Sequence, residues 1–232
     1  MDPAPAVLAK VIEGYLRARP RAVRWREWLE RRRYAFAAFP DRSRPLVIVA
    51  HSSRDAARAA QIVHAVEHDW PSVPIACRES YTEILDKAPG IIVIQLRRKN
   101  VCGCLGHRHL VVKEPPFAEP HEAFAGAEVG EMDIACERVE SWLALPLLDT
   151  ALDTKFMAGS RLREFRDEQL RLRLLSILLH ETHHMVFPRD REDAVRDRSL
   201  AFYREALASY VEYARATMSL TIDRSFARFG RD

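Results

Sequence analysis

Residues 160–187 read SRLREFRDEQLRLRLLSILLHETHHMVF, and this stretch predicts a long helix around which the rest of the fold is organised. Ser160 is a residue type that caps the first turn of a helix, and Pro188 follows where a helix must end. The first turns are rich in charged residues, whereas residues 174–179 are mostly apolar. We therefore expect a helix with a charged beginning and a buried end.

The predicted helix ends in His180-Glu181-Thr182-His183-His184, which has the pattern H-E-x-x-H. Residues four positions apart share one helix face, so His180 and His184 can offer two imidazoles to one metal ion. Neutral imidazole suits Zn²⁺, and Glu181 projects near the open position of such an ion, where it can deprotonate a water molecule. The alternative is a helix end whose histidines complement the helix dipole.

A catalytic zinc ion needs a third protein ligand, and the sequence favours Glu205 for this position. No third histidine follows at the spacing of the metzincin pattern, which leaves a carboxylate. Glu192 and Asp193 come directly after the helix, and we expect them to lie too close to it to fold back. The next predicted helix starts near residue 197 or 199 and carries Glu205, followed by small residues that allow close approach. Glu212 would need that helix shifted by about 10 Å.

Upstream of the histidines, short apolar segments predict the strands of a sheet. The predicted strands are Leu46–Ala50, Val73–Cys77, Ile91–Leu96, His109–Lys113 and Glu131–Val139. A helix is predicted over Asp55–His68, between the first two strands. The segment His51-Ser52-Ser53 after the first strand has no glycine, which argues against a phosphate-binding loop.

These features together resemble the gluzincin group of zinc metallopeptidases, in particular its small soluble members, the minigluzincins. The resemblance rests on His180, Glu181, His184 and Glu205, and on the string EALASY at residues 205–210. It implies an α+β fold of the zincin type. In this fold a mixed five-stranded sheet packs on a backing helix and an active-site helix, and a following helix carries the third ligand.

The resemblance also implies a function, namely hydrolysis of peptide bonds by a water molecule that one Zn²⁺ ion activates and Glu181 deprotonates. The substrate would be a peptide or protein bound along an edge strand that includes Leu105, His107 and His109. Ser209 could hydrogen-bond a ligand imidazole. The transition state could be stabilised by Tyr210 or Tyr213, or by His107 or His109 from the edge strand, although a structural role is the plainer explanation for each of these four. His183 points elsewhere and is expected to pack or to support a ligand.

The first 44 residues differ in composition from the rest and predict an Arg-rich helical extension, with the metallopeptidase domain at residues 45–232. Residues 17–44 carry a net charge of +7, and the remainder of the chain carries −4. Arg31, Arg32 and Arg33 stand near Trp and Tyr residues and could contact a nucleic-acid backbone. A protease acting on nucleoprotein substrates is therefore one alternative, and a solvated helix face is the plainer explanation.

The composition of the 232-residue chain excludes several classes of protein. No apolar run reaches membrane-spanning length, and the N-terminal residues lack the pattern of a secretory signal, so we expect a cytoplasmic protein with reduced thiols. Cys102, Cys104, His107 and His109 are spaced more tightly than the ligands of usual zinc sites, and we expect no second, structural zinc there. A non-catalytic binding protein of the same shape is a further alternative, against which the intact Glu181 argues.

Overall fold

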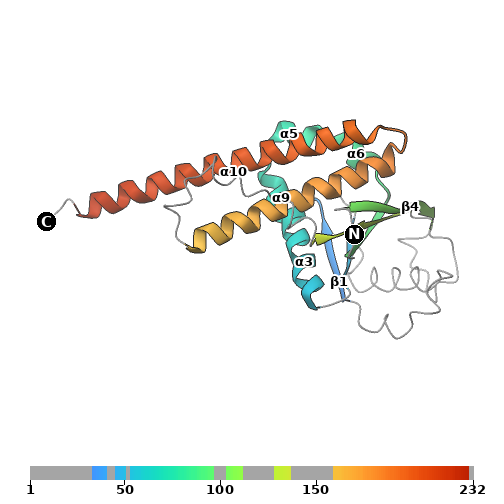
Figure 1. Ribbon diagram of the computed structural model, residues 1–232, viewed down its shortest axis with the longest axis horizontal. Coiled ribbons are helices and arrows are strands. Elements are labelled where there is room, and N and C mark those ends of the chain that lie inside the picture. Colours follow the sequence, from blue (N-terminus) through green and yellow to red (C-terminus); the bar gives the residue numbers. More distant parts are fainter. Residues whose placement is uncertain are drawn as a thin grey trace.

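The computed structural model describes residues 33–40, 45–50, 53–96, 103–111, 128–136 and 159–229, and within them it shows a mixed α+β arrangement (Figure 1). The strands form one sheet, and the described helices pack against one face of this sheet. No helix in these described ranges is long and apolar enough to cross a membrane.

The sheet is built from strands β1 to β5 in the spatial order β1-β2-β3-β5-β4. Their bounds are Arg33–Ala38 for β1, Pro45–Ala50 for β2, Ile91–Leu96 for β3, Gly103–Val111 for β4 and Glu128–Ile134 for β5. β2, β3 and β5 run parallel to one another. At the two ends of the sheet, β1 pairs antiparallel with β2, and β4 pairs antiparallel with β5. β3 is buried along its whole length, and its sequence IIVIQL is apolar except for Gln95, as is typical of a central parallel strand.

Four of the predicted strands lie in this sheet, but the strand predicted at Val73–Cys77 is wrong. That segment forms the short helix α5 (Ile75–Glu79), whose first turn begins at Pro74. The carbonyl of Pro74 accepts hydrogen bonds from the backbone N–H groups of Cys77 and Arg78. Proline has no N–H group to donate between paired strands, which disfavours a strand here. Its carbonyl can still accept the hydrogen bonds that close a helical turn.

The remaining place in the sheet belongs to β1, which lies inside the segment predicted as a helical extension. β1 pairs with β2 from Arg33↔Ala50 to Ala38↔Pro45. Residues 33–38 read RYAFAA, and their Arg and Ala favour a helix locally, but pairing with a buried neighbour overrides this preference. The predicted extension therefore contributes to the sheet, while its residues 1–32 lie outside the described ranges.

Four helices and a π-helical turn follow β2 before the chain returns to the sheet. They are α3 (Ser53–His64), the π-helix η2 (Ala65–Asp69), α4 (Trp70–Ser72), α5 and α6 (Thr82–Lys87). The helix predicted over Asp55–His68 is thus present, as α3 continued by η2. Its apolar side contributes Ile62 and Val66 to the core.

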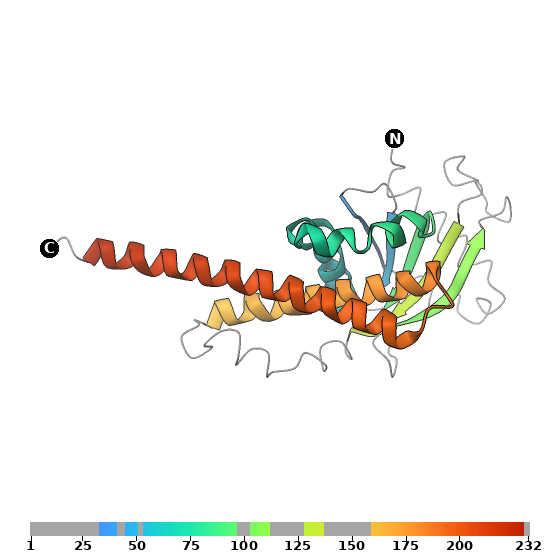
Figure 2. The same ribbon diagram turned by 90° about the horizontal axis from the view of Figure 1, so that it is seen from above.

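Two long helices complete the described chain and lie side by side in opposite directions (Figure 2). The first, α9 (Gly159–Val186), confirms the helix predicted from the histidine motif. The second, α10 (Glu192–Phe229), begins earlier than the predicted start near residues 197 or 199. Glu192 and Asp193 occupy its first turn, where negative charge is favoured by the helix dipole.

The register between α9 and α10 stays constant along their contact. Near one end, the ring of Phe165 packs against Tyr210 with centroids 5.9 Å apart. In the middle, the hydroxyl of Ser176 donates to the backbone oxygen of Ser199 at 2.7 Å. A step of one residue along α9 is therefore matched by about one residue backward along α10, as expected for two antiparallel helices of equal rise.

The end of α9 approaches the sheet closely at Gly130 of β5. A Cβ atom on Gly130 would lie 2.6 Å from Sδ of Met185 and 2.8 Å from Cγ of Pro89, both shorter than van der Waals contact. Met185 directly follows the histidine motif and is buried. The missing side chain at Gly130 therefore sets how near the motif lies to the sheet.

We predict that Gly130→Ala lowers the free energy of unfolding by about 1–3 kcal/mol, because it overpacks the contact with Met185 and Pro89. Chemical denaturation followed by circular dichroism measures this change. Gly130→Val should cost more than Gly130→Ala, whereas equal stability of both variants and the wild type would contradict the close contact.

Candidate metal centre

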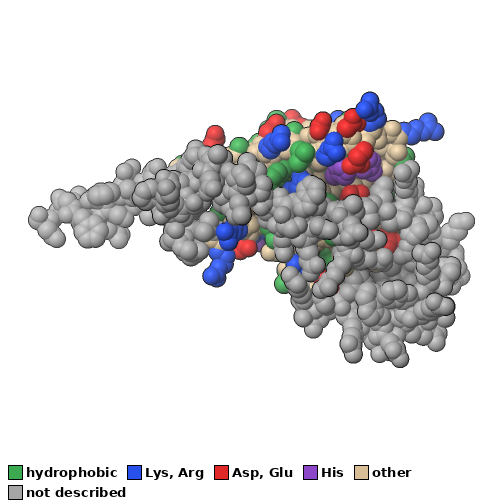
Figure 3. All heavy atoms as spheres, viewed as in Figure 1, with side chains coloured by type: hydrophobic (Ala, Val, Ile, Leu, Met, Phe, Trp, Pro, Cys, Tyr) green, Lys and Arg blue, Asp and Glu red, His purple; other side chains and the backbone are tan. Residues whose placement is uncertain are grey.

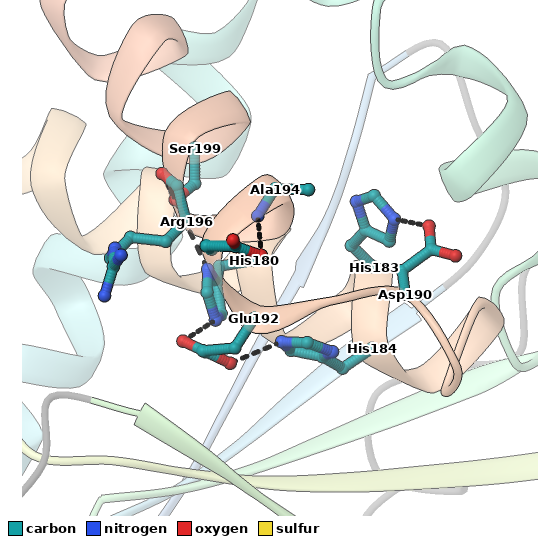
Figure 4. A network of polar contacts seen from close by, with 9 residues as sticks. His180, His183, His184, Asp190, Glu192, Ala194, Arg196 and Ser199 are labelled. Carbon is teal, nitrogen blue, oxygen red and sulfur yellow. Dashed lines mark hydrogen bonds and ion pairs between the residues drawn. The ribbon is translucent and has the colours of Figure 1, made fainter.

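Two imidazoles of α9 and one carboxylate of α10 meet where the two helices are joined (Figure 4). The rings of His180 and His184 lie on one helix face, with centroids 4.8 Å apart. Nε2 of His184 lies 2.9 Å from Oε2 of Glu192, and Nε2 of His180 lies 3.4 Å from Oε1. The three side chains offer ligand atoms within 4.8 Å of one another, so they could hold a metal ion.

Glu192 reaches the imidazoles because the turn between the helices is short and is held by hydrogen bonds. The expectation that it lies too close to fold back is wrong. The N–H of Phe187 donates to the carbonyl of His183, and the N–H of Asp190 donates to that of Phe187. The ring of His183 also meets the Asp190 carboxylate, with Nε2 2.8 Å from Oδ2. His183 thus points away from the other two histidines, as predicted, and fastens the turn (Figure 4).

Ser199 of α10 sets the orientation and the tautomer of His180. Its hydroxyl lies 2.9 Å from the carbonyl oxygen of Arg196 and 3.3 Å from Nδ1 of His180. The shorter contact takes the single hydroxyl hydrogen, so Ser199 Oγ accepts a hydrogen bond from Nδ1–H. The lone pair of His180 is then on Nε2, the atom that faces Glu192, and burial lowers the pKa of His180, which favours this neutral form.

The contact between His180 and Glu192 therefore brings two acceptors toward each other. A neutral imidazole nitrogen and a carboxylate oxygen repel unless a cation lies between them. Glu192 remains 67% exposed while its two partners are mostly covered, so an ion can reach the group from solvent. Histidine side chains come to the surface here, beside acidic and basic side chains (Figure 3).

Glu181 lies next to this group but is turned into the protein, with only 6% of its surface exposed. Burial raises the pKa of Glu181 to about 7, and the charge of Glu192 adds to the effect. No hydrogen bond to its carboxyl group occurs within the described ranges. A carboxyl group in this state can both take up and release a proton near neutral pH.

Glu205, the predicted third ligand, is not brought to the two imidazoles. The register places it beside residue 170 of α9, about ten positions from His180, which is ~15 Å along the helix. Its Oε2 instead accepts a hydrogen bond from the thiol of Cys77 at 2.9 Å. Burial raises the pKa of Cys77 to about 11, and the bond to Glu205 adds to the effect, so the thiol remains a donor.

The other predicted site residues on α10 lie beyond Glu205 and thus further from the histidines. Tyr210 packs on Phe165, and Tyr213 is 70% exposed. Neither these two nor Ser209 or Glu212 has a contact with His180 or His184 in the described structure.

Other predicted site residues lie on β4 or outside the described ranges. Leu105 and His107 pair through their backbones with Met132 and Glu131 of β5, and His109 belongs to the same strand, β4. The side chains of these residues and of Cys104 lie outside the description, as do Arg31, Arg32 and Cys102 altogether and the side chain of Arg33.

No protein family, curated protein or solved structure matches the chain. One signal in the sequence could have indicated the role of Glu192, which we expect to lie too close to the helix, and of Asp190, for which the sequence predicts no role. Asp190 and Glu192 are acidic residues just after the proline that ends α9, in a segment too short to form anything but a turn. An acidic pair there can start the next helix and still face the preceding one.

The tautomer of His180 is directly measurable. We predict Nδ1–H with unprotonated Nε2 in the metal-free wild type, read from the imidazole ¹⁵N shifts by NMR. Ser199→Ala removes one neutral hydrogen bond of about 1 kcal/mol and should reduce this preference about fivefold. Ser209→Ala is the matched control and should change nothing. A wild-type His180 protonated on Nε2 would contradict the assignment.

Proposed function

We propose that this chain is a zinc-dependent metallopeptidase in which His180, His184 and Glu192 hold the ion and Glu181 is the general base. The observation that supports this most strongly is the convergence of the three donor side chains within 4.8 Å. Two of them come from an H-E-x-x-H motif on a helix, and the third comes from the next helix.

The chemistry of the donors favours zinc over other common ions. Two imidazole nitrogens and one carboxylate oxygen form the ligand set of many catalytic zinc sites, and they leave a coordination position for water or substrate. Mg²⁺ and Ca²⁺ would instead require mostly oxygen ligands. The hydrogen bond between His180 and Ser199 supports a ligand imidazole in the way that such sites commonly show.

In this proposal Glu181 transfers the protons of hydrolysis. When bound, the zinc ion would supply a Lewis acid that polarises the substrate carbonyl and makes water more acidic. The Glu181 carboxylate would accept the proton of the attacking water and pass it to the leaving amine. Glu181 directly follows His180 in the chain, and its burial limits competing contacts with solvent.

A peptide substrate is favoured by the arrangement of the sheet beside α9. β4 occupies the end of the described sheet, pairs with β5, and contacts α9. An extended peptide can add to such an edge strand through backbone hydrogen bonds. A sheet edge next to the histidine helix is also what a zincin-like fold would provide, and we propose that fold with the third ligand moved to Glu192.

The ligand set is tested by replacing Glu192 or Glu205 and measuring the affinity of each variant for zinc. We predict that Glu192→Gln weakens zinc binding by at least about tenfold, since the amide is a poorer ligand than the carboxylate. Glu205→Gln is the matched control on the same helix and should bind zinc like the wild type. Competition with a chromogenic chelator measures both affinities.

The opposite pattern would overturn this ligand set. If Glu205→Gln lost zinc and Glu192→Gln kept it, the third ligand would be Glu205. Circular dichroism of both variants separates loss of a ligand from loss of the fold.

Catalysis is tested by Glu181→Gln, which keeps the size of the side chain but removes the base. We predict a fall in kcat of about 10²–10⁴-fold with zinc content unchanged, because general base catalysis contributes on this scale. A quenched-fluorescent peptide library provides the substrates, and removal and return of zinc provides the control. Zinc binding without hydrolysis of any peptide by the wild type would support a binding protein instead.

A further inference from the structure

A second pair of histidines lies outside the proposed catalytic site, at the junction of α3 and η2. His64 ends α3, and His68 follows four residues later in the π-helical turn. Their ring centroids lie 4.8 Å apart, and both residues are exposed. Single π-helical turns within helices occur frequently at functional sites, because they change which side chains share a face.

One ring of this pair is held in place by a buried carboxylate. Nδ1 of His64 lies 3.0 Å from Oδ1 of Asp69, whose own side chain is only 7% exposed. The other oxygen, Oδ2, accepts a hydrogen bond of 2.7 Å from Nε of Arg171 on α9. Arg171 also forms an ion pair with Glu168, which holds the guanidinium group in place against Asp69.

This hydrogen bond leaves Nε2 of His64 available to a ligand. A carboxylate can only accept, so Nδ1 of His64 carries the hydrogen and, in the neutral ring, the lone pair is on Nε2. A carboxylate behind a histidine is the usual support of a metal-binding imidazole, because it fixes the tautomer and makes the ring more basic.

The arrangement repeats the main features of the proposed zinc site. In both pairs the histidines are four residues apart and their ring centroids are separated by 4.8 Å. In both, the first histidine is held through Nδ1 by an oxygen, from Asp69 in one case and Ser199 in the other. Two imidazoles in this relation on one helical face can bind the same ion.

We propose that His64 and His68 bind a divalent transition-metal ion of the imidazole-preferring class, such as Zn²⁺ or Cu²⁺. The site is independent of the proposed catalytic one, since no residue is shared. Among the described residues no third protein ligand joins the pair, so water completes the coordination and the ion exchanges readily. Binding would stabilise the junction of α3 and η2, because an ion that binds only the folded state favours that state.

Cu²⁺ is the sharpest probe, because it binds nitrogen ligands most strongly of the first-row divalent ions and is paramagnetic. We predict that the full-length chain binds Cu²⁺ at this pair and that His68→Gln weakens that binding by at least about tenfold. His64→Gln should do the same. Glu67→Gln, in the same turn, is the matched control and should retain the wild-type affinity.

The variants must be measured in a background that removes the other histidines able to bind Cu²⁺ as a pair. In a chain with His107, His109, His180 and His184 all replaced by Gln, Cu²⁺ should broaden the NMR signals of residues near His64 and His68 before others, and electron paramagnetic resonance should show nitrogen coupling. Adding His68→Gln should raise the Cu²⁺ concentration needed for both signals by at least about tenfold while the amide spectrum stays folded. Equal affinity and equal broadening with and without His68→Gln would overturn the proposal and leave the pair as the polar end of α3.

Discussion

The antiparallel register of α9 and α10 is the constraint on which the proposed site depends. Both helices rise equally per residue, so the turn between them decides which residues face each other along the whole contact. That turn is closed by backbone hydrogen bonds and by the contact of His183 with Asp190. It places Glu192 against His184 at one end of the contact and Tyr210 against Phe165 toward the other. A turn a few residues longer would bring a different carboxylate to the histidines.

Local hydrogen bonds then orient the side chains that the register brings together. Ser199 holds the ring of His180, and the tautomer that results turns a lone pair toward Glu192. Gly130 lets the end of α9, which carries the motif, come close to the sheet. Glu181 is buried beside His180, and its burial raises the pKa of its carboxyl group to about 7, so both protonation states are accessible near neutral pH. The same combination of an imidazole pair and a supporting oxygen recurs at His64 and His68.

The elements with strong periodic patterns were predictable from the sequence, and those decided by tertiary contacts were not. The helix ending in the histidine motif and the buried run of β3 follow from local composition and are present. β1 lies in the first 44 residues, where apolar residues at helical spacing predict a helical extension, and only pairing with β2 makes it a strand. Glu205 is the preferred third ligand when the next helix is expected to begin near residue 197 or 199, whereas α10 begins at Glu192. The choice between Glu205 and Glu192 depends on the turn geometry, which residue spacing alone does not specify.

Anomalous diffraction at the zinc absorption edge, on crystals of the full chain grown with zinc, would show directly whether His180, His184 and Glu192 hold the ion. We predict that the strongest anomalous peak lies between these three side chains. The ion should be about 2.0–2.2 Å from Nε2 of each histidine and from one carboxylate oxygen. A peak bound to His180 and His184 but to Glu205 in place of Glu192, or the absence of any peak at the two histidines, would contradict it.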